Sequence, residues 1–183
     1  IPYQVIGQCQ GTDLVGIRYE QLLDYCLPYE DAENAFVVIP GDFVTTEDGT
    51  GIVHTAPTFG ADDALVAKAA GVPPMLILDE KGNPVPLVDL QGRFRKEVND
   101  PVFGLGGEYV KAEYLEGNEI EEELEIQREK LKDIIADLKA YMSVDDRITL
   151  KLKIANKAFK IEKYEHSYPH CWRTDKPILY YPL

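Results

Sequence analysis

Residues 48–63 read D-G-T-G-I-V-H-T-A-P-T-F-G-A-D-D, and this stretch predicts a strand that passes directly into a helix. Asp48-Gly49 is a strong turn signal. The β-branched pair Ile52-Val53 favours a short buried strand, which the Ala-Pro pair further along brings to an end. The strand therefore delivers the imidazole of His54 to the corner where the chain turns.

The second half of the stretch predicts a helix. The helical run extends from Asp62 to Ala70, and Gly71 closes it. Asp62 and Asp63 lie in its first turn, where a carboxylate commonly caps a helix or complements its dipole. One imidazole and two carboxylates therefore converge on this corner, which makes it the most site-like place in the sequence.

Length and composition predict a soluble globular protein. The chain has 183 residues, of which 45% are hydrophobic and 28% charged, so it can bury a substantial core. No apolar run approaches the length of a membrane span. The chain begins without Met, which suggests a piece excised from a longer one. Three widely spaced cysteines predict reduced thiols and a cytoplasmic location: Cys9, Cys26 and Cys171.

The rest of the chain predicts a β-rich α+β domain. Residues 35–39 and 75–78 read as buried strands, and Lys81-Gly82-Asn83-Pro84 reads as a turn after which residues 85–88 pair back. Strands separated by short helices and by Gly and Pro turns are typical of this fold class.

Residues 118–142 differ in character, because their apolar residues have helical spacing. We expect one long helix here, begun by a capping box of Asn118 and Glu121. Residues 148–154 alternate, which leaves open an extended strand or a further helix. Region 116–150 is therefore expected to be a helical appendage of the domain.

Three sequence blocks carry a resemblance to a known family. The block G-T-G-I-V-H-T-A-P-T-F-G-A-D-D resembles the signature of the editing domain inserted into isoleucyl-tRNA synthetases, which are class I aminoacyl-tRNA synthetases. Residues 164–181 resemble the segment where the chain returns to the synthetase body, so 164–183 is assigned to that return. The weaker block L-V-G-I-R-Y-E, residues 14–20, resembles a motif that precedes the signature. The resemblance covers nearly all of residues 1–183, and the isoleucine branch fits best.

The resemblance implies a fold, a reaction and roles for residues. It implies a small β-barrel flanked by helices that hydrolyses valine wrongly attached to isoleucine tRNA. Asp63 aligns with the family's carboxylate that holds the α-amino group of the misattached amino acid, and His54 lines a pocket that excludes isoleucine. Thr50, Thr55 and Asp62 are the other expected substrate-binding residues, although Asp62 also fits a helix cap.

The resemblance also implies partners and cofactors. The expected partners are the 3′ end of a tRNA and the remainder of the synthetase chain, in a monomer with no membrane contact. Editing needs no cofactor, whereas the parent synthetase uses ATP and Mg²⁺ elsewhere. The net charge of −13 predicts weak RNA binding by the isolated chain. A threonine-rich strand of the family's pocket lies upstream of the matched residues, so the chain is expected to hold part of that pocket.

Two other functions fit the residues. One is the editing domain of a valine- or leucine-specific relative, although V-H-T-A-P and H-C-W-R favour isoleucine. The other is a non-catalytic interaction domain in which the acidic helix 118–142 docks a partner. Without the resemblance, His54 reads as a structural histidine and Asp63 as a helix cap.

The group H-x-x-x-H-C at residues 166–171 raises the question of zinc. Helical spacing would be needed to bring these side chains together, and Tyr168-Pro169 breaks a helix. We therefore predict no metal site. Trp172 and Arg173 are expected to contact the synthetase body.

Overall fold

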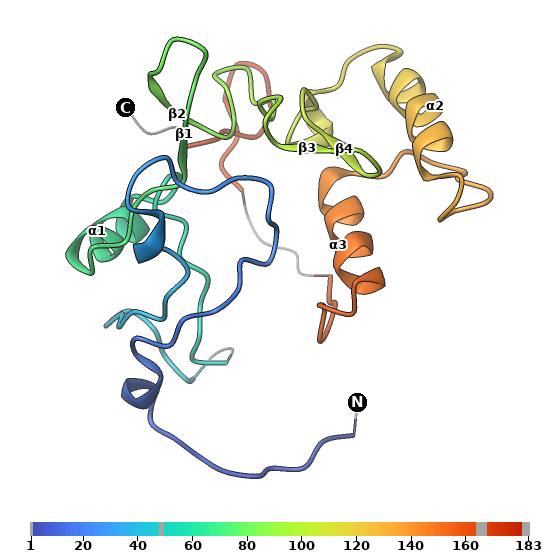
Figure 1. The fold of residues 1–183 in the computed structure, drawn as a ribbon. Helices are drawn as coiled ribbons and strands as arrows, with labels where there is room; N and C mark the ends of the chain where they lie inside the picture. The colour runs from blue at the N-terminus through green and yellow to red at the C-terminus, as the bar shows by residue number, and fades with distance from the viewer. Residues whose placement is uncertain (1, 48–49, 164–167, 181–183) are drawn as a thin grey trace. The chain divides into compact units, whose positions relative to one another are not determined.

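The computed structural model describes residues 2–47, 50–163 and 168–180 (Figure 1). The chain divides into two compact units, one reaching to Pro84 and one beginning at Val85. The α-helices are α1 (Ala61–Ala69), α2 (Glu119–Leu131) and α3 (Val144–Ile154). The strands are β1 (Leu76–Leu78), β2 (Pro84–Pro86), β3 (Asn99–Asp100) and β4 (Gly104–Leu105), and the 3-10 helices are η1 (Gly11–Leu14), η2 (Ala32–Asn34) and η3 (Ala112–Tyr114).

Helices and small sheets together confirm the α+β class. Among the described residues, β1 pairs with β2 and β3 pairs antiparallel with β4, so the strands form two separate two-stranded sheets and close no barrel. No helix in the described part of the chain combines the length and apolarity that a membrane crossing requires. The predicted turn at Asp48-Gly49 lies outside the described residues.

In the first unit, α1 forms where the sequence predicts a helix. It ends at a glycine, because Gly71 adopts a φ of 71° and the next amide, of Val72, donates to the carbonyl of Ala67 at 2.9 Å. Ala67 is 1% exposed and, with Ala35 and Ile77, forms the buried apolar part of this unit. The strand predicted over 75–78 is confirmed as β1, and Gly82 forms the turn after it with a φ of 80°.

The predicted buried strand at Ile52-Val53 is wrong. The two side chains are 63% and 51% exposed, and neither residue lies in a strand. The amide of Ile52 is bonded instead to the hydroxyl of Thr50 at 3.3 Å, a local turn bond that competes with strand pairing. Residues 35–39 likewise form no named strand, since only Val37 makes an isolated bridge, to Arg18.

In the second unit, the helix predicted over 118–142 is wrong beyond Leu131. The amides of Ile134 and Ile135 both donate to the carbonyl of Leu131, at 2.8 and 2.7 Å, which turns the chain out of the helix. This turn brings Leu138 back onto Leu131 and Phe103, the three buried residues of the local core. The side chains packed around them are those of Leu124, Ile135, Met142 and Leu150.

Two further expectations for this region concern the helix or strand at 148–154 and the capping box at Asn118. Residues 148–154 are helical and belong to α3, which begins after Ser143. The Ser143 hydroxyl accepts a hydrogen bond from the amide of Asp146 at 3.1 Å, so it caps the helix. Asn118 precedes α2, but its side chain makes no capping hydrogen bond, so the predicted capping box is not formed.

We expect Ser143→Ala to lower the free energy of unfolding by about 1 kcal/mol, because one amide of the first turn of α3 loses its acceptor. Asn118→Ala is the matched control, since it removes a side chain that caps nothing and should change stability by less than about 0.5 kcal/mol. Urea unfolding followed by circular dichroism measures both. Equal effects of the two substitutions would contradict the capping role of Ser143.

Candidate functional site

The corner before α1 is organised by the carboxylate of Asp63. Asp63 is half-buried in the first turn of α1, and its Oδ2 accepts a hydrogen bond from the backbone N–H of Ala56 at 3.0 Å. No partner for Oδ1 exists among the described residues. One oxygen of the carboxylate therefore holds the preceding loop, and the other makes no hydrogen bond within the described part of the chain.

The loop between Ala56 and α1 is fixed at several points. The amides of Phe59 and Gly60 both donate to the carbonyl of Ala56 at 3.1 Å, and the amide of Ala64 donates to the carbonyl of Gly60 at 2.8 Å. The Thr58 side chain is 6% exposed, and its hydroxyl donates to the carbonyl of Met75 at 3.3 Å. The loop thus has a defined course without regular secondary structure.

His54 and Thr55 lie immediately before this loop. The His54 side chain is exposed and makes no hydrogen bond within the described part of the chain, whereas Thr55 is half-buried. The carboxylate of Asp63 is bonded to the N–H of Ala56, the residue that follows Thr55 in the chain. The structure therefore joins Asp63 to the loop that follows His54 and Thr55, through the N–H of Ala56.

The structure does not join the other two predicted residues to this group. The Thr50 hydroxyl donates to the carbonyl of Ile52 at 3.1 Å, so it is engaged in its own turn. Asp62 is exposed in the first turn of α1, which fits the helix-dipole role. No hydrogen bond links either residue to Asp63 in the part of the chain that the structure describes.

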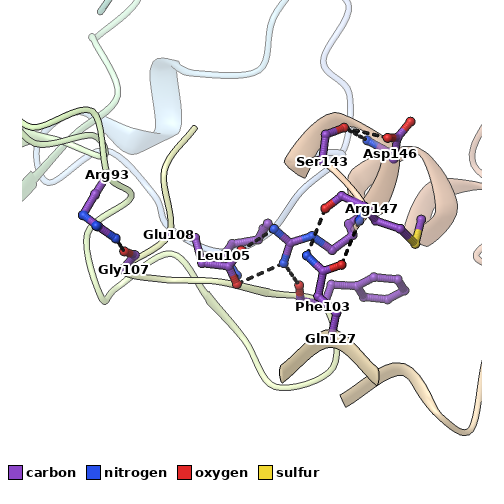
Figure 2. Close-up of polar contacts among 10 residues, drawn as sticks. Arg93, Phe103, Leu105, Gly107, Glu108, Gln127, Ser143, Asp146 and Arg147 are labelled. Atoms are coloured by element: carbon purple, nitrogen blue, oxygen red, sulfur yellow. Dashed lines mark hydrogen bonds and ion pairs between the residues drawn. The ribbon is translucent and has the colours of Figure 1, made fainter. Parts of the chain in front are cut away.

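The second unit contains a buried ionic cluster that the sequence did not predict (Figure 2). Arg147, on α3, is 1% exposed, and its guanidinium is paired with both carboxylate oxygens of Glu108. It also donates to the carbonyl of Phe103 at 2.6 Å. In sequence, Arg147 is one more charge in a helical segment, and nothing in the spacing indicates that it is buried.

The surroundings of this cluster shift two pKa values. Burial raises the pKa of Glu123, and the nearby carboxylate of Glu108 raises it further. Burial likewise raises the pKa of Tyr141. A second ion pair lies in the same unit, where Lys151 Nζ is 2.7 Å from Asp100 Oδ2. The two ion pairs, Arg147 with Glu108 and Lys151 with Asp100, connect α3 to the segment around β3 and β4, which is a structural role.

The segment considered for zinc is described only in part, since His166 lies outside the described residues. Nδ1 of His170 lies 2.7 Å from the carbonyl of Tyr168. The pKa of Cys171 is lowered, chiefly by a hydrogen bond with the Thr174 side chain. Hydrogen bonds with the backbone of Arg173 and Thr174 lower this pKa by smaller amounts. Within the described ranges, no group of three His, Cys, Asp or Glu side chains could hold a metal ion.

Trp172 is 84% exposed, and the Arg173 guanidinium lies 4.5 Å from the centre of its ring. Their predicted contact with the synthetase body stays a prediction.

A hollow of about 340 Å³ lies elsewhere in the second unit, where an ion pair with Lys176 lowers the pKa of Glu116. It contains none of the predicted site residues, and its lining is Gln91, Tyr109, Tyr114, Glu116, Glu119 and Lys176.

Comparison with known proteins extends over the whole chain. No protein-family model matches it. It is 59% identical over 183 residues to the isoleucine–tRNA ligase of Cytophaga hutchinsonii, covering 100% of this chain and 15% of that protein. It is 47% identical over 195 residues to that of Porphyromonas gingivalis, covering 100% and 15%, and 39% identical over 181 residues to that of Thermoplasma acidophilum, covering 99% and 13%.

The similarity runs from end to end of these residues, and the chain spans only about 15% of the length of the Cytophaga and Porphyromonas relatives. The resemblance seen in the three sequence blocks is thereby confirmed at the level of the family. The chain belongs to the isoleucine–tRNA ligase family, as the counterpart of one segment of its much longer members.

Proposed function

We propose that the corner before α1, with His54, Thr55 and Asp63, forms a hydrolytic proofreading site that removes valine from isoleucine tRNA. The observation that carries the proposal is the half-buried Asp63 carboxylate, which holds the loop after His54 with one oxygen and leaves the other oxygen without a partner in the described structure. An aminoacyl ester carries a free α-ammonium group, and a fixed anion is the group that binds such a cation. Family membership supplies a reaction in which an ester of this kind must be recognised.

A physical limit creates the need for such a site. Valine and isoleucine differ by one methylene, the usual example of a difference worth only about 1–3 kcal/mol in an apolar pocket. A second, smaller site can accept valyl-tRNA and exclude isoleucyl-tRNA. In this proposal His54 and Thr55 shape that smaller site, with Thr50 and Asp62 at its margin.

The proposed reaction is the addition of water to the ester carbonyl carbon. The new carbon–oxygen bond replaces the bond to the ribose oxygen, which leaves with a proton as the tRNA hydroxyl, and valine is released. Asp63 Oδ1 binds the ammonium and thereby orients the carbonyl toward the attacking water. No covalent protein nucleophile and no cofactor take part, whereas ATP and Mg²⁺ serve attachment of the amino acid elsewhere in the synthetase.

The proposal assigns the remaining contacts to other parts of the polypeptide. With a net charge of −13, this segment cannot provide the main electrostatic grip on a tRNA backbone. The rest of the synthetase, a cytoplasmic monomer in this proposal, supplies that grip. It also supplies the strands that complete a barrel around the exposed Ile52-Val53 stretch.

A panel of misacylated tRNAs tests the proposal in the full-length synthetase. We expect rapid release of valine from isoleucine tRNA and no release of isoleucine from the same tRNA. Valine tRNA carrying threonine and leucine tRNA carrying norvaline are the controls for the related specificities. Preferential hydrolysis of either control would contradict the isoleucine assignment, and no hydrolysis of any ester would contradict proofreading.

A further inference from the structure

We propose that Gly60 is a positioning residue for Asp63, because its missing side chain leaves the space that the Asp63 carboxylate occupies. This inference deepens the proposed function and rests on it. Gly60 is the residue immediately before α1, with φ −111° and ψ 124°, an extended conformation that any residue adopts. The backbone at this position therefore gives no reason for glycine, and the reason must lie in the surrounding space.

The space around Gly60 is filled by one side chain. A Cβ atom at residue 60 would lie 2.6 Å from Asp63 Oδ2, 2.9 Å from its Cγ and 3.0 Å from its Cβ. All three distances are below ordinary contact between non-bonded carbon or oxygen atoms. Because even the first carbon of the Asp63 side chain is too close, turning the carboxylate alone does not relieve the contact. Rotation about χ1 would move Oδ2 and Cγ away but leaves Cβ in place, so a methyl group at residue 60 requires a new Asp63 rotamer together with a backbone shift of a few tenths of an ångström.

Loss of that orientation would have two consequences at the candidate site. The amide of Ala56 would lose its acceptor, so the loop that follows His54 and Thr55 would lose one of its anchors. Oδ1, the oxygen proposed to bind the ammonium, would also point elsewhere. Gly60 touches no substrate in this scheme, and it acts only through Asp63.

The test uses Gly60→Ala, Asp63→Ala and the double variant in the full-length synthetase, with Gly7→Ala as the matched control. Gly7 has nothing within 4 Å of an added Cβ and has no positive φ, so the same methyl group is added there without contact. We expect Gly60→Ala to lower kcat/KM for valyl-tRNA hydrolysis by about 10- to 100-fold. Gly7→Ala should hydrolyse at the parent rate, and all variants should retain aminoacylation.

Two readouts separate positioning from a general loss of structure. The double variant should hydrolyse no more slowly than Asp63→Ala alone, because both changes remove the same carboxylate from the same place. The parent should also prefer valyl-tRNA over N-acetylvalyl-tRNA, which has no ammonium, and Gly60→Ala should lose that preference as Asp63→Ala does. Multiplied losses in the double variant, or a Gly60→Ala variant at the parent rate, would overturn the inference.

Thermal unfolding of the same four proteins tests the contact between residues 60 and 63 without depending on catalysis. Gly60→Ala should lower the unfolding midpoint by crowding Asp63, and an unchanged midpoint would overturn the inference. The added Asp63→Ala change should restore part of the loss, because it removes the carboxylate from the contact. An undiminished loss in the double variant would overturn the inference. An Asp63→Ala protein that hydrolyses valyl-tRNA at the parent rate would instead refute the proposed function, and the thermal result would still decide the role of Gly60.

Discussion

Asp63→Ala is expected to lower valyl-tRNA hydrolysis by the full-length synthetase by about 100-fold, while attachment of isoleucine proceeds at the parent rate. The reason is that the ammonium of the bound ester loses its fixed anion. Removing one partner of a desolvated charge pair costs about 2–5 kcal/mol, and each 1.4 kcal/mol is a factor of ten. Release of labelled valine from preformed valyl-tRNA measures the hydrolysis, and aminoacylation measured in parallel reports that the protein is folded.

Two further substitutions make this result specific. Asp63→Asn keeps an oxygen that can accept the hydrogen bond from Ala56 and removes only the charge, so it should lose hydrolysis and keep the loop. Asp24→Ala removes an exposed carboxylate from the same unit, one that forms no hydrogen bond within the described ranges, and should hydrolyse at the parent rate. A fully active Asp63→Asn protein would show that the charge is not used, and the ammonium-binding role would have to be abandoned.

Glu108→Ala is expected to lower the free energy of unfolding by about 3–5 kcal/mol. The substitution leaves the guanidinium of Arg147, which is 1% exposed, without its carboxylate partner, and an uncompensated buried charge carries a cost of this size. The bonds to the carbonyl of Phe103 and to Tyr141 do not neutralise that charge. Urea unfolding of the 183-residue chain, followed by the helical circular dichroism signal, measures the loss.

Glu129→Ala is the matched control for this prediction. Glu129 forms an ion pair with Lys132 at 2.6 Å, but its side chain is 77% exposed, and exposed pairs contribute at most about 1 kcal/mol. Replacing both members of the buried pair, as Glu108→Leu with Arg147→Met, should recover most of the stability because no charge remains buried. A loss below about 1 kcal/mol for Glu108→Ala would show that the pair is not what fastens α3.

The parts of the fold that the sequence predicted well depend on neighbouring residues. The glycine at position 71 ends α1 as expected, through its own φ of 71°, and the turn around Gly82 follows β1 as expected. The choice between helix and strand at 148–154 was open because alternation alone does not decide it. The capping bond of Ser143 favours the helix, and that bond is also local.

The errors arose where distant residues decide the structure. The apolar residues after Leu131 have helical spacing, yet the same spacing is satisfied by a turn that returns Leu138 to the core beside Phe103. The Arg128 side chain supports that turn by donating to the carbonyl of Leu138 at 3.0 Å, a contact across ten residues. The sequence alone does not indicate whether a continuous helix or a turn after Leu131 buries these side chains.

The candidate site shows the same division. A carboxylate in the first turn of α1 was predictable because the helical run and the glycine that closes it locate the helix, although the strand expected before it does not form. The bond from Ala56 to Asp63 and the space left by Gly60 were not, because they depend on the rotamer of one side chain. The exposure of Ile52 was mispredicted because β-branching favours a strand without specifying its partner.

The side-chain amide of Gln127 joins α2 to the segment before α3 through two hydrogen bonds. Gln127 is 2% exposed; its nitrogen donates to the carbonyl of Met142 at 3.0 Å, and its oxygen accepts from the amide of the same residue at 2.8 Å. A carboxyl group in its place, as in Gln127→Glu, could donate to the Met142 carbonyl only in its protonated form, because an ionised carboxylate has no proton to give. The junction of α2 with the segment before α3 therefore depends on one N–H donor, which a substitution of almost the same shape removes.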